Sequence, residues 1–125
     1  MKDPDKFCII DCREKIEYEV SFIPKAVHFT GTNFEREDTI FANNQAPVLF
    51  YCSIGYRSSL AARRFQECFP WRNVYNLEGS IFEYANKGHT LQKKDGQTND
   101  SGLIKVHGYG KNWCKLLKKE YRYLD

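Results

Sequence analysis

The sequence predicts an α/β fold built around a parallel β-sheet. Two short runs, 7–11 (FCIID) and 47–52 (PVLFYC), have the length and apolar character of strands buried on both faces of a sheet. A helical pattern follows the second run, and further strands and helices alternate with short connections. This order is typical of an α/β fold, in which ligand sites lie beyond the carboxyl ends of the parallel strands.

The remaining strands and turns follow in chain order. Residues 23–29 predict a turn that leads into a short strand. Residues 73–77 predict another strand, and Glu78–Gly79 form a turn after it.

Three helices complete this part of the chain. Residues 33–41 predict a short helix capped by Thr32 or Asn33. The helix after Cys52 is expected to start at a cap on Ser58 or Ser59 and to end at Pro70, and residues 80–87 predict a short helix that ends at Gly88. The apolar stripe of the middle helix consists of Ala61, Phe65, Cys68 and Phe69.

The length of 125 residues fits one globular core. We divide the chain into a domain over 1–92, a polar loop over 93–102, and a basic tail over 103–125. The tail has a local charge of +4, which leaves −1 for the rest of a chain whose net charge is +3. Its apolar residues recur at helical spacing, so we expect an amphipathic helix packed on the same domain. These residues are Trp113, Leu116, Leu117, Tyr121 and Leu124.

Composition argues against several classes of protein. The mild charge is not that of a dedicated nucleic-acid binder, and no apolar run approaches the roughly 20 residues that cross a bilayer. The charged start of the chain contains no signal-peptide core, and five cysteines at irregular spacing suit a reducing compartment, so we expect a cytoplasmic protein.

The three histidines have no metal-ligand spacing, and Cys8 and Cys12 on one strand would lie about 13 Å apart. We therefore expect no metal site.

The segment after the second apolar run predicts an anion site with a nucleophile. Cys52 ends the run, and residues 53–57 (SIGYR) lead into a helix. A short loop between a buried strand and a helix start can turn backbone N–H groups toward one point, which would stabilise a thiolate there. Gly55 would allow the tight curl, and Arg57 would offer a charge to an oxyanion. The simpler alternatives are that Cys52 fills core space and that Arg57 caps a surface helix.

Three segments in order resemble the rhodanese (sulfurtransferase) family. Residues 51–59 (YCSIGYRSS) resemble its active-site loop, residues 9–14 (IIDCRE) with 23–26 (IPKA) its first strand and turn, and residues 76–79 (NLEG) a later turn. The resemblance implies an open parallel β-sheet flanked by helices on both faces. It also implies that Cys52 carries a sulfane sulfur as a persulfide, taken from a donor anion such as thiosulfate and passed to cyanide or a thiol. This mechanism needs no metal and no organic cofactor.

The resemblance further implies roles for the loop residues. The backbone amides between Ser53 and Ser58 would cradle the persulfide, and Arg57 would contact the donor anion. Asp11 and Arg13 match a pair that braces the neighbouring loops. The complete set of substrate-binding residues implied in this way is Ser53, Ile54, Gly55, Tyr56, Arg57 and Ser58.

Two alternative functions remain. Related tyrosine phosphatases place five residues between cysteine and arginine, whereas four separate Cys52 from Arg57, and nothing in the sequence positions Asp11 as the proton donor that a phosphatase needs. The second alternative is a non-catalytic or regulatory module, since the turn at 21–26 (SFIPKA) departs from the family pattern. Cys12, at the end of its strand, is a candidate resolving thiol.

Family members also carry a strand and helix before the segment that matches Phe7. The sheet is then one strand short, or the tail covers its edge, or the chain is a fragment. An exposed edge or the basic tail could bind a second copy or another protein.

Overall fold

A parallel sheet of four strands forms the centre of the molecule, and the predicted fold class is confirmed. The computed structural model describes residues 7–30, 46–99, 102–108 and 114–123. The strands are β1 (Cys8–Asp11), β2 (Val27–His28), β3 (Val48–Tyr51) and β4 (Val74–Asn76), in the order β2-β1-β3-β4 with every pairing parallel.

The two central strands, β1 and β3, are buried along their whole length, as their apolar sequences predict. Successive side chains alternate between the faces of the sheet. Ile9, Leu49 and Tyr51 belong to one core cluster, whereas Ile10 and Phe50 belong to the cluster on the other face.

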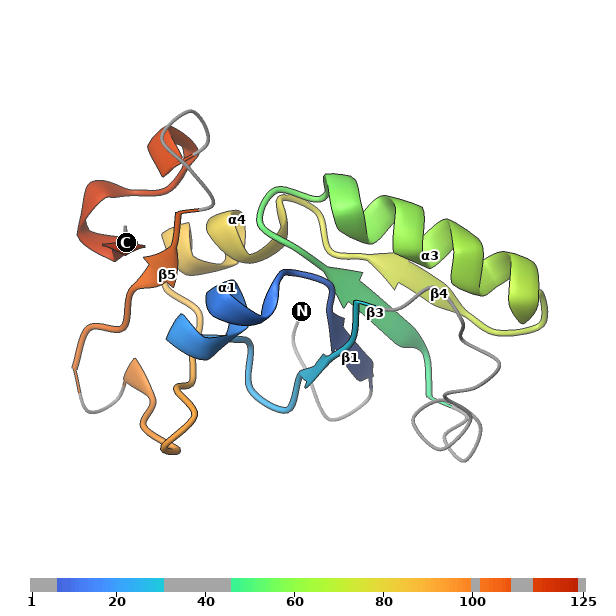
Figure 1. Cartoon of the computed structure of the whole chain (residues 1–125), viewed down its shortest axis with the longest axis horizontal. Coiled ribbons are helices and arrows are strands. Elements are labelled where there is room, and N and C mark those ends of the chain that lie inside the picture. The colour runs from blue at the N-terminus through green and yellow to red at the C-terminus, as the bar shows by residue number, and fades with distance from the viewer. Residues whose placement is uncertain (1–6, 31–45, 100–101, 109–113, 124–125) are drawn as a thin grey trace.

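Helices cover both faces of the sheet (Figure 1). Helix α3 (Tyr56–Cys68) packs its buried Phe65 against Phe50, and Ala61, Cys68 and Phe69 pack around this cluster as the predicted stripe requires. Helices α1 (Lys15–Val20) and α4 (Ser80–Asn86) lie on the opposite side, where Ile81, Phe82 and Ala85 of α4 enter the other core.

Two details of the helices differ from expectation. The N-cap of α3 is Gly55, with φ of 112°, and no side chain caps it, so the predicted caps on Ser58 and Ser59 are wrong. Helix α1 was not predicted, because the residue that it buries is Glu17 rather than an apolar stripe. The helix expected over 33–41 falls outside the described residues.

The described residues of the tail do not form the amphipathic helix that the spacing of its apolar residues predicts. Its described residues form two short 3-10 helices, η3 (Cys114–Leu116) and η4 (Lys119–Tyr121), and a parallel pair of strands, β5 (Val106–His107) and β6 (Arg122–Tyr123). Lys118 lies between the 3-10 helices with ψ of 138°, an extended conformation that interrupts helical hydrogen bonding. Ile104, Val106 and Leu117 are buried with the core of α4.

The described part of the tail adds no strand to the main sheet. Strand β5 pairs with β6 and lies against α1 and α4, so β2 and β4 remain the edges of the four-stranded sheet among the described residues. Of the three alternatives for the sheet edge, coverage by the tail is therefore wrong for the described part of the chain. Among those residues, no helix is both long enough and apolar enough to cross a membrane.

Candidate active site at Cys52

Cys52 is the first residue after β3, at the carboxyl end of the sheet, and its exposed fraction is 1%. The loop of residues 53–55 then curls back, so that the Gly55 N–H donates a hydrogen bond to Cys52 Sγ over 3.1 Å. This curl needs the left-handed conformation at Gly55, which a side chain disfavours. The sulfur therefore lies at the amino-terminal end of α3, where the helix dipole stabilises negative charge.

Ser58 forms the second polar contact of the sulfur. Its hydroxyl lies 3.4 Å from Cys52 Sγ and 2.6 Å from Asn76 Oδ1, so its single proton can be donated to either acceptor. Asn76, at the end of β4, in turn donates from Nδ2 to the Gly55 carbonyl over 3.3 Å. Adjacent strand ends and the start of α3 thus converge on one sulfur atom.

These contacts change the acidity of Cys52. Burial disfavours the thiolate, but hydrogen bonds from the Ser58 side chain, the Ser58 and Gly55 backbone amides, and the charge of Arg57 outweigh burial and lower the pKa of the Cys52 thiol. A thiol of lowered pKa at a helix start is a better nucleophile near neutral pH than a free cysteine.

The start of α4 fixes the backbone beside the sulfur. Ser80 Oγ accepts a hydrogen bond from the Cys52 N–H over 3.1 Å, and the amides of Ile81 and Phe82 donate to the carbonyls of Cys52 and Ser53, each over 3.1 Å. The turn before α4 depends on Gly79, whose φ is 72° and where a Cβ would lie 2.4 Å from Glu83 Cβ. The loop is therefore held from two helices.

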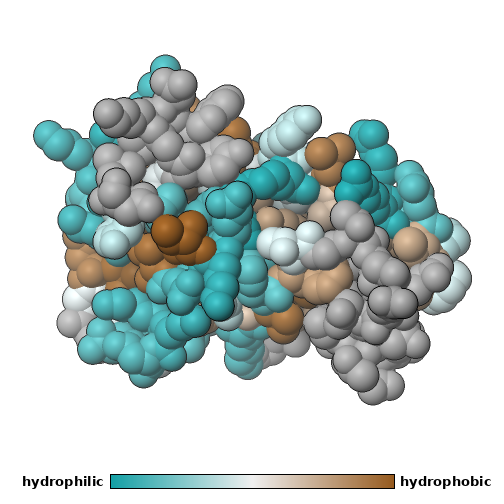
Figure 2. All heavy atoms as spheres, in the orientation of Figure 1, coloured by the Kyte–Doolittle hydropathy of each residue, from teal (hydrophilic) through white to brown (hydrophobic). Residues whose placement is uncertain are grey.

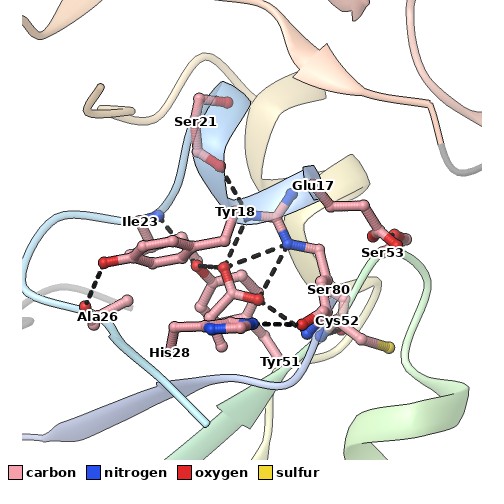
Figure 3. Close-up of polar contacts among 12 residues, drawn as sticks. Glu17, Tyr18, Ser21, Ile23, Ala26, His28, Tyr51, Cys52, Ser53 and Ser80 are labelled. Carbon is pink, nitrogen blue, oxygen red and sulfur yellow. Dashed lines mark hydrogen bonds and ion pairs between the residues drawn. The ribbon is translucent and has the colours of Figure 1, made fainter. Parts of the chain in front are cut away.

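Arg57 is bound by a buried carboxylate. Its two terminal nitrogens donate to Glu17 Oε1 and Oε2, each over 3.0 Å, and Nη2 also donates to Ser53 Oγ over 3.0 Å. Ser53 Oγ donates to Glu17 as well, and Figure 3 shows Glu17 and Ser53 side by side. The predicted anion contact is thus an arginine whose charge Glu17 already balances.

Asp11 and Arg13 form a second ion pair, on the face of the sheet opposite to Cys52. Arg13 Nη2 donates to Asp11 Oδ2 over 2.7 Å and to the Ser21 carbonyl over 2.6 Å. Tyr51 donates to the same carboxylate and accepts from the Ile23 N–H. In Figure 3 the Cys52 sulfur points away from Tyr51 and its neighbours. This cluster joins the strand ends to the turn at 21–23.

The last two predicted loop residues lie farther from the chemistry. Tyr56 is 71% exposed, and Ile54 is half-buried against the core that contains α4. Ser53, Gly55, Arg57 and Ser58 are brought together around the sulfur and its arginine. The assignment of individual roles to the six loop residues, and of a supporting role to Asp11 and Arg13, remains a prediction.

Three contributing residues were not in the predicted site. Glu17, Asn76 and Ser80 contact Arg57, Ser58 and Cys52 respectively. Asn76 lies in the segment 76–79 that resembles a family signature, Ser80 follows it directly, and Glu17 lies three residues after the segment 9–14. What the sequence lacked was a signal that Glu17, exposed by 1%, turns inward from its helix.

A groove lined by described residues lies away from Cys52. It encloses about 630 Å³ between α1 and the segment before β5, with Ile16, Val20 and Leu103 among its lining residues. Figure 2 shows hydrophobic atoms exposed in this region. Among the described residues, no three histidines, cysteines or acids gather in a cluster that could hold a metal ion.

Comparison with known proteins decides the family. The family model for the rhodanese-like domain matches residues 1–87. The chain belongs to the rhodanese-like domain family. Cys52 and its loop therefore lie in the part of the chain that this family defines, as the resemblance of residues 51–59 predicts.

Curated relatives include tRNA uridine(34) hydroxylases. The protein of Hamiltonella defensa is 29% identical over 118 residues, which cover 90% of this chain and 30% of the relative. The protein of Yersinia pestis is 30% identical over 90 residues, which cover 68% and 25%. The chain thus spans between a quarter and a third of the length of these relatives.

Solved structures show the same fold. A thiosulfate sulfurtransferase from Pseudomonas aeruginosa matches with a TM-score of 0.63 and 20% identity, covering 74% of this chain and 17% of that one. A Rhodopseudomonas palustris protein described as a possible tyrosine phosphatase matches with a TM-score of 0.57 and 23% identity, covering 68% and 70%. At such identities the likeness extends to the fold alone.

Proposed function

We propose that this rhodanese-like domain is a sulfurtransferase that carries sulfur on Cys52. The observation that carries the proposal is the polarity around Cys52 Sγ, where the Gly55 amide and the Ser58 hydroxyl stabilise a thiolate. The thiolate attacks the outer sulfur of thiosulfate, the S–S bond of the donor breaks with its electron pair on sulfite, and Cys52 becomes a persulfide.

The second half of the reaction returns the thiolate. Cyanide or a thiol attacks the outer sulfur of the persulfide, and the bond to Cys52 Sγ breaks with its electrons on the cysteine. No other cofactor takes part in this scheme. The four-residue interval between Cys52 and Arg57 supports transfer of a single sulfur atom over transfer of a phosphoryl group.

The test compares thiocyanate formation from thiosulfate and cyanide in wild type and Cys52→Ser. We expect complete loss of activity in that variant, and a gain of about 32 Da on Cys52 after incubation of wild type with thiosulfate. Cys68→Ser is the matched control, since Cys68 is another free thiol but lies at the far end of α3. Equal thiocyanate formation in wild type and Cys52→Ser would contradict the proposal.

The phosphatase alternative has less support. Asp11, the available acid, is fully buried and bound by Arg13 and Tyr51 on the face away from Cys52. A group held in this way has no path to a leaving oxygen near the sulfur. We expect no Cys52-dependent turnover of p-nitrophenyl phosphate.

A second candidate function is a role in tRNA modification. The similarity to tRNA uridine(34) hydroxylases favours it, because in one relative it covers 90% of the chain and so extends into the basic tail over 103–125. Lys115, Lys118 and Lys119 are exposed there and would offer charge to phosphates. This candidate runs against the prediction, made from total charge, that nucleic acid is not a partner.

Binding to tRNA in a gel-shift titration tests the second candidate. Replacing Lys115, Lys118 and Lys119 by glutamate should then abolish the shift. These surface substitutions are preferable to removal of the tail, which would also remove Leu117 from the core. The same variants test the alternative of a non-catalytic module. That alternative predicts that the wild type binds a partner protein but forms no thiocyanate, and that the glutamate variants lose this binding.

A further inference from the structure

Cys12 and Cys52 end neighbouring strands at the same level of the sheet. Strands β1 and β3 pair in parallel with Asp11 opposite Tyr51. The residues that follow these two strands are Cys12 and Cys52. The Cys12 N–H donates to the Tyr51 carbonyl over 2.9 Å, which keeps the two chains paired one residue beyond the strands.

The two thiols also share one face. Cys12 and Cys52 belong to the core cluster that contains Ile10, Phe50 and Phe65, beneath α3. Neighbouring strands lie about 4.8 Å apart, and a disulfide forms between residues whose Cα atoms are about 4.4–6.8 Å apart. The backbone therefore places these two cysteines within the range of a disulfide.

Both thiols are shielded from solvent, with exposed fractions of 9% for Cys12 and 1% for Cys52. Burial and the negative charges of Asp11 and Cys52 raise the pKa of Cys12, whereas the pKa of Cys52 is lowered, so Cys52 ionises at a lower pH than Cys12. The two thiols are therefore not equivalent: Cys52 forms a thiolate more readily than its neighbour.

We propose that Cys12 is the resolving thiol of the Cys52 persulfide. This step rests on the proposed function of Cys52 as a sulfur carrier. The negatively charged outer sulfur of the persulfide takes the proton of Cys12, and the resulting Cys12 thiolate attacks the inner sulfur, Cys52 Sγ. A Cys12–Cys52 disulfide forms, the bond between the inner and outer sulfur breaks, and the outer sulfur leaves as hydrosulfide, so charge and atoms balance.

The electrons balance within the same step. The sulfane sulfur is reduced to sulfide while the two cysteine sulfurs are oxidised to a disulfide, and no external oxidant is needed. A dithiol reductant then restores both thiols. The buried inner sulfur is poorly accessible to a thiol from solution, whereas Cys12 lies beside it. The consequence is release of sulfide without an external acceptor.

The experiment loads the full chain with inorganic polysulfide, removes the excess without oxygen, and follows sulfide release and intact mass without reductant. We expect the wild-type adduct of about 32 Da to decay to a form about 2 Da lighter than the reduced protein, with stoichiometric sulfide. Cys12→Ser should keep the adduct and release at least tenfold less sulfide. A persistent wild-type adduct, or decay at the wild-type rate in Cys12→Ser, would overturn the proposal.

Cys8→Ser is the matched control. Cys8 lies on the same strand and the same face and has the same exposed fraction of 9%, but it is about 13 Å from Cys12 along the strand. This variant should behave as wild type, and it leaves one cysteine in the tryptic peptide 7–13, so the Cys12–Cys52 link can be mapped directly. A link that requires Cys8 would contradict the proposal.

The outcome is separable from that of the proposed function. Polysulfide forms the persulfide whether or not thiosulfate is a donor, so failure of the thiosulfate and cyanide assay leaves this test intact. Conversely, thiocyanate formation together with a stable adduct would retain the proposed function and reject Cys12 as the resolving thiol.

Discussion

Two ion pairs near the carboxyl ends of the strands differ in burial, and the difference separates support from chemistry. The side chains of Arg13 and Asp11 both have 0% exposure, whereas Arg57 is 23% exposed beside a Glu17 that is 2% exposed. The first pair is closed to any ligand. The second is open on its arginine side, so an anion could exchange with Glu17 there.

The largest expected effect comes from breaking the closed pair. Asp11→Ala leaves the buried Arg13 charge without its carboxylate, and we expect a loss of about 3–5 kcal/mol in the free energy of unfolding. Urea denaturation measures this loss. Glu19→Ala is the control, because it removes the exposed Lys94–Glu19 pair and should cost less than about 1 kcal/mol. Similar losses in the two variants would contradict the comparison.

The open pair should matter for donor binding. Arg57→Ala removes a charged hydrogen-bond donor worth about 1.5–3 kcal/mol to an anion, so we expect the KM for thiosulfate to rise roughly ten- to hundredfold. Steady-state kinetics checks this against Arg64→Ala, an exposed arginine on the same helix. An unchanged KM in Arg57→Ala would mean that the open arginine does not bind the donor.

The hydroxyl of Tyr51 donates a hydrogen bond to Asp11 of the closed pair. Tyr51→Phe leaves the Ile23 N–H and one Asp11 oxygen without this partner. We expect a loss of about 1–2 kcal/mol in urea denaturation, with thiocyanate formation retained at low temperature. Tyr75→Phe, on an exposed side chain of β4, is the control. No difference between the two variants would show that the cluster tolerates the loss.

The smallest expected effect concerns Ser58, next to the open pair. Because the pKa of Cys52 is lowered, the rate of alkylation by iodoacetamide should rise with pH and level off below the range of a free thiol, about 8.5. Ser58→Ala removes one stabilising contact and should move this inflection to higher pH. Ser59→Ala, whose hydroxyl faces the Tyr56 carbonyl, should leave it in place. An inflection that moves in both variants or in neither would contradict the role of Ser58.

The sequence predicted the parts of the fold that depend on local pattern. The apolar runs became β1 and β3, and the apolar stripe after Cys52 became the buried face of α3, because burial on a sheet imposes these patterns. The helix predicted in the tail was wrong for the residues that the structure describes there. The apolar spacing of the tail suited a helix, but the extended backbone at Lys118 and the pairing of β5 with β6 depend on tertiary contacts.

The candidate site was predicted in part for the same reason. Cys52, Gly55 and Arg57 are close in sequence, so a motif could bring them together. Glu17 is 40 residues from its partner Arg57, and its inward direction follows from how α1 packs on the sheet. That Cys12 and Cys52 lie close together could be predicted from the ends of parallel strands. That they lie on the same face of the sheet could be known only from the register of β1 against β3.

That register makes β1 sensitive to changes of length. Asp11 and Cys12 are consecutive, so their side chains lie on opposite faces of the sheet. Loss or gain of one codon within the strand would move the carboxylate of Asp11 to the face of Cys52 and the thiol of Cys12 to the other face. The same change in the polar turn around Gly96, where a side chain would meet open space, alters no paired strand of the main sheet. In a library of single-codon deletions selected for folded protein, variants in β1 should therefore disappear while variants near Gly96 persist.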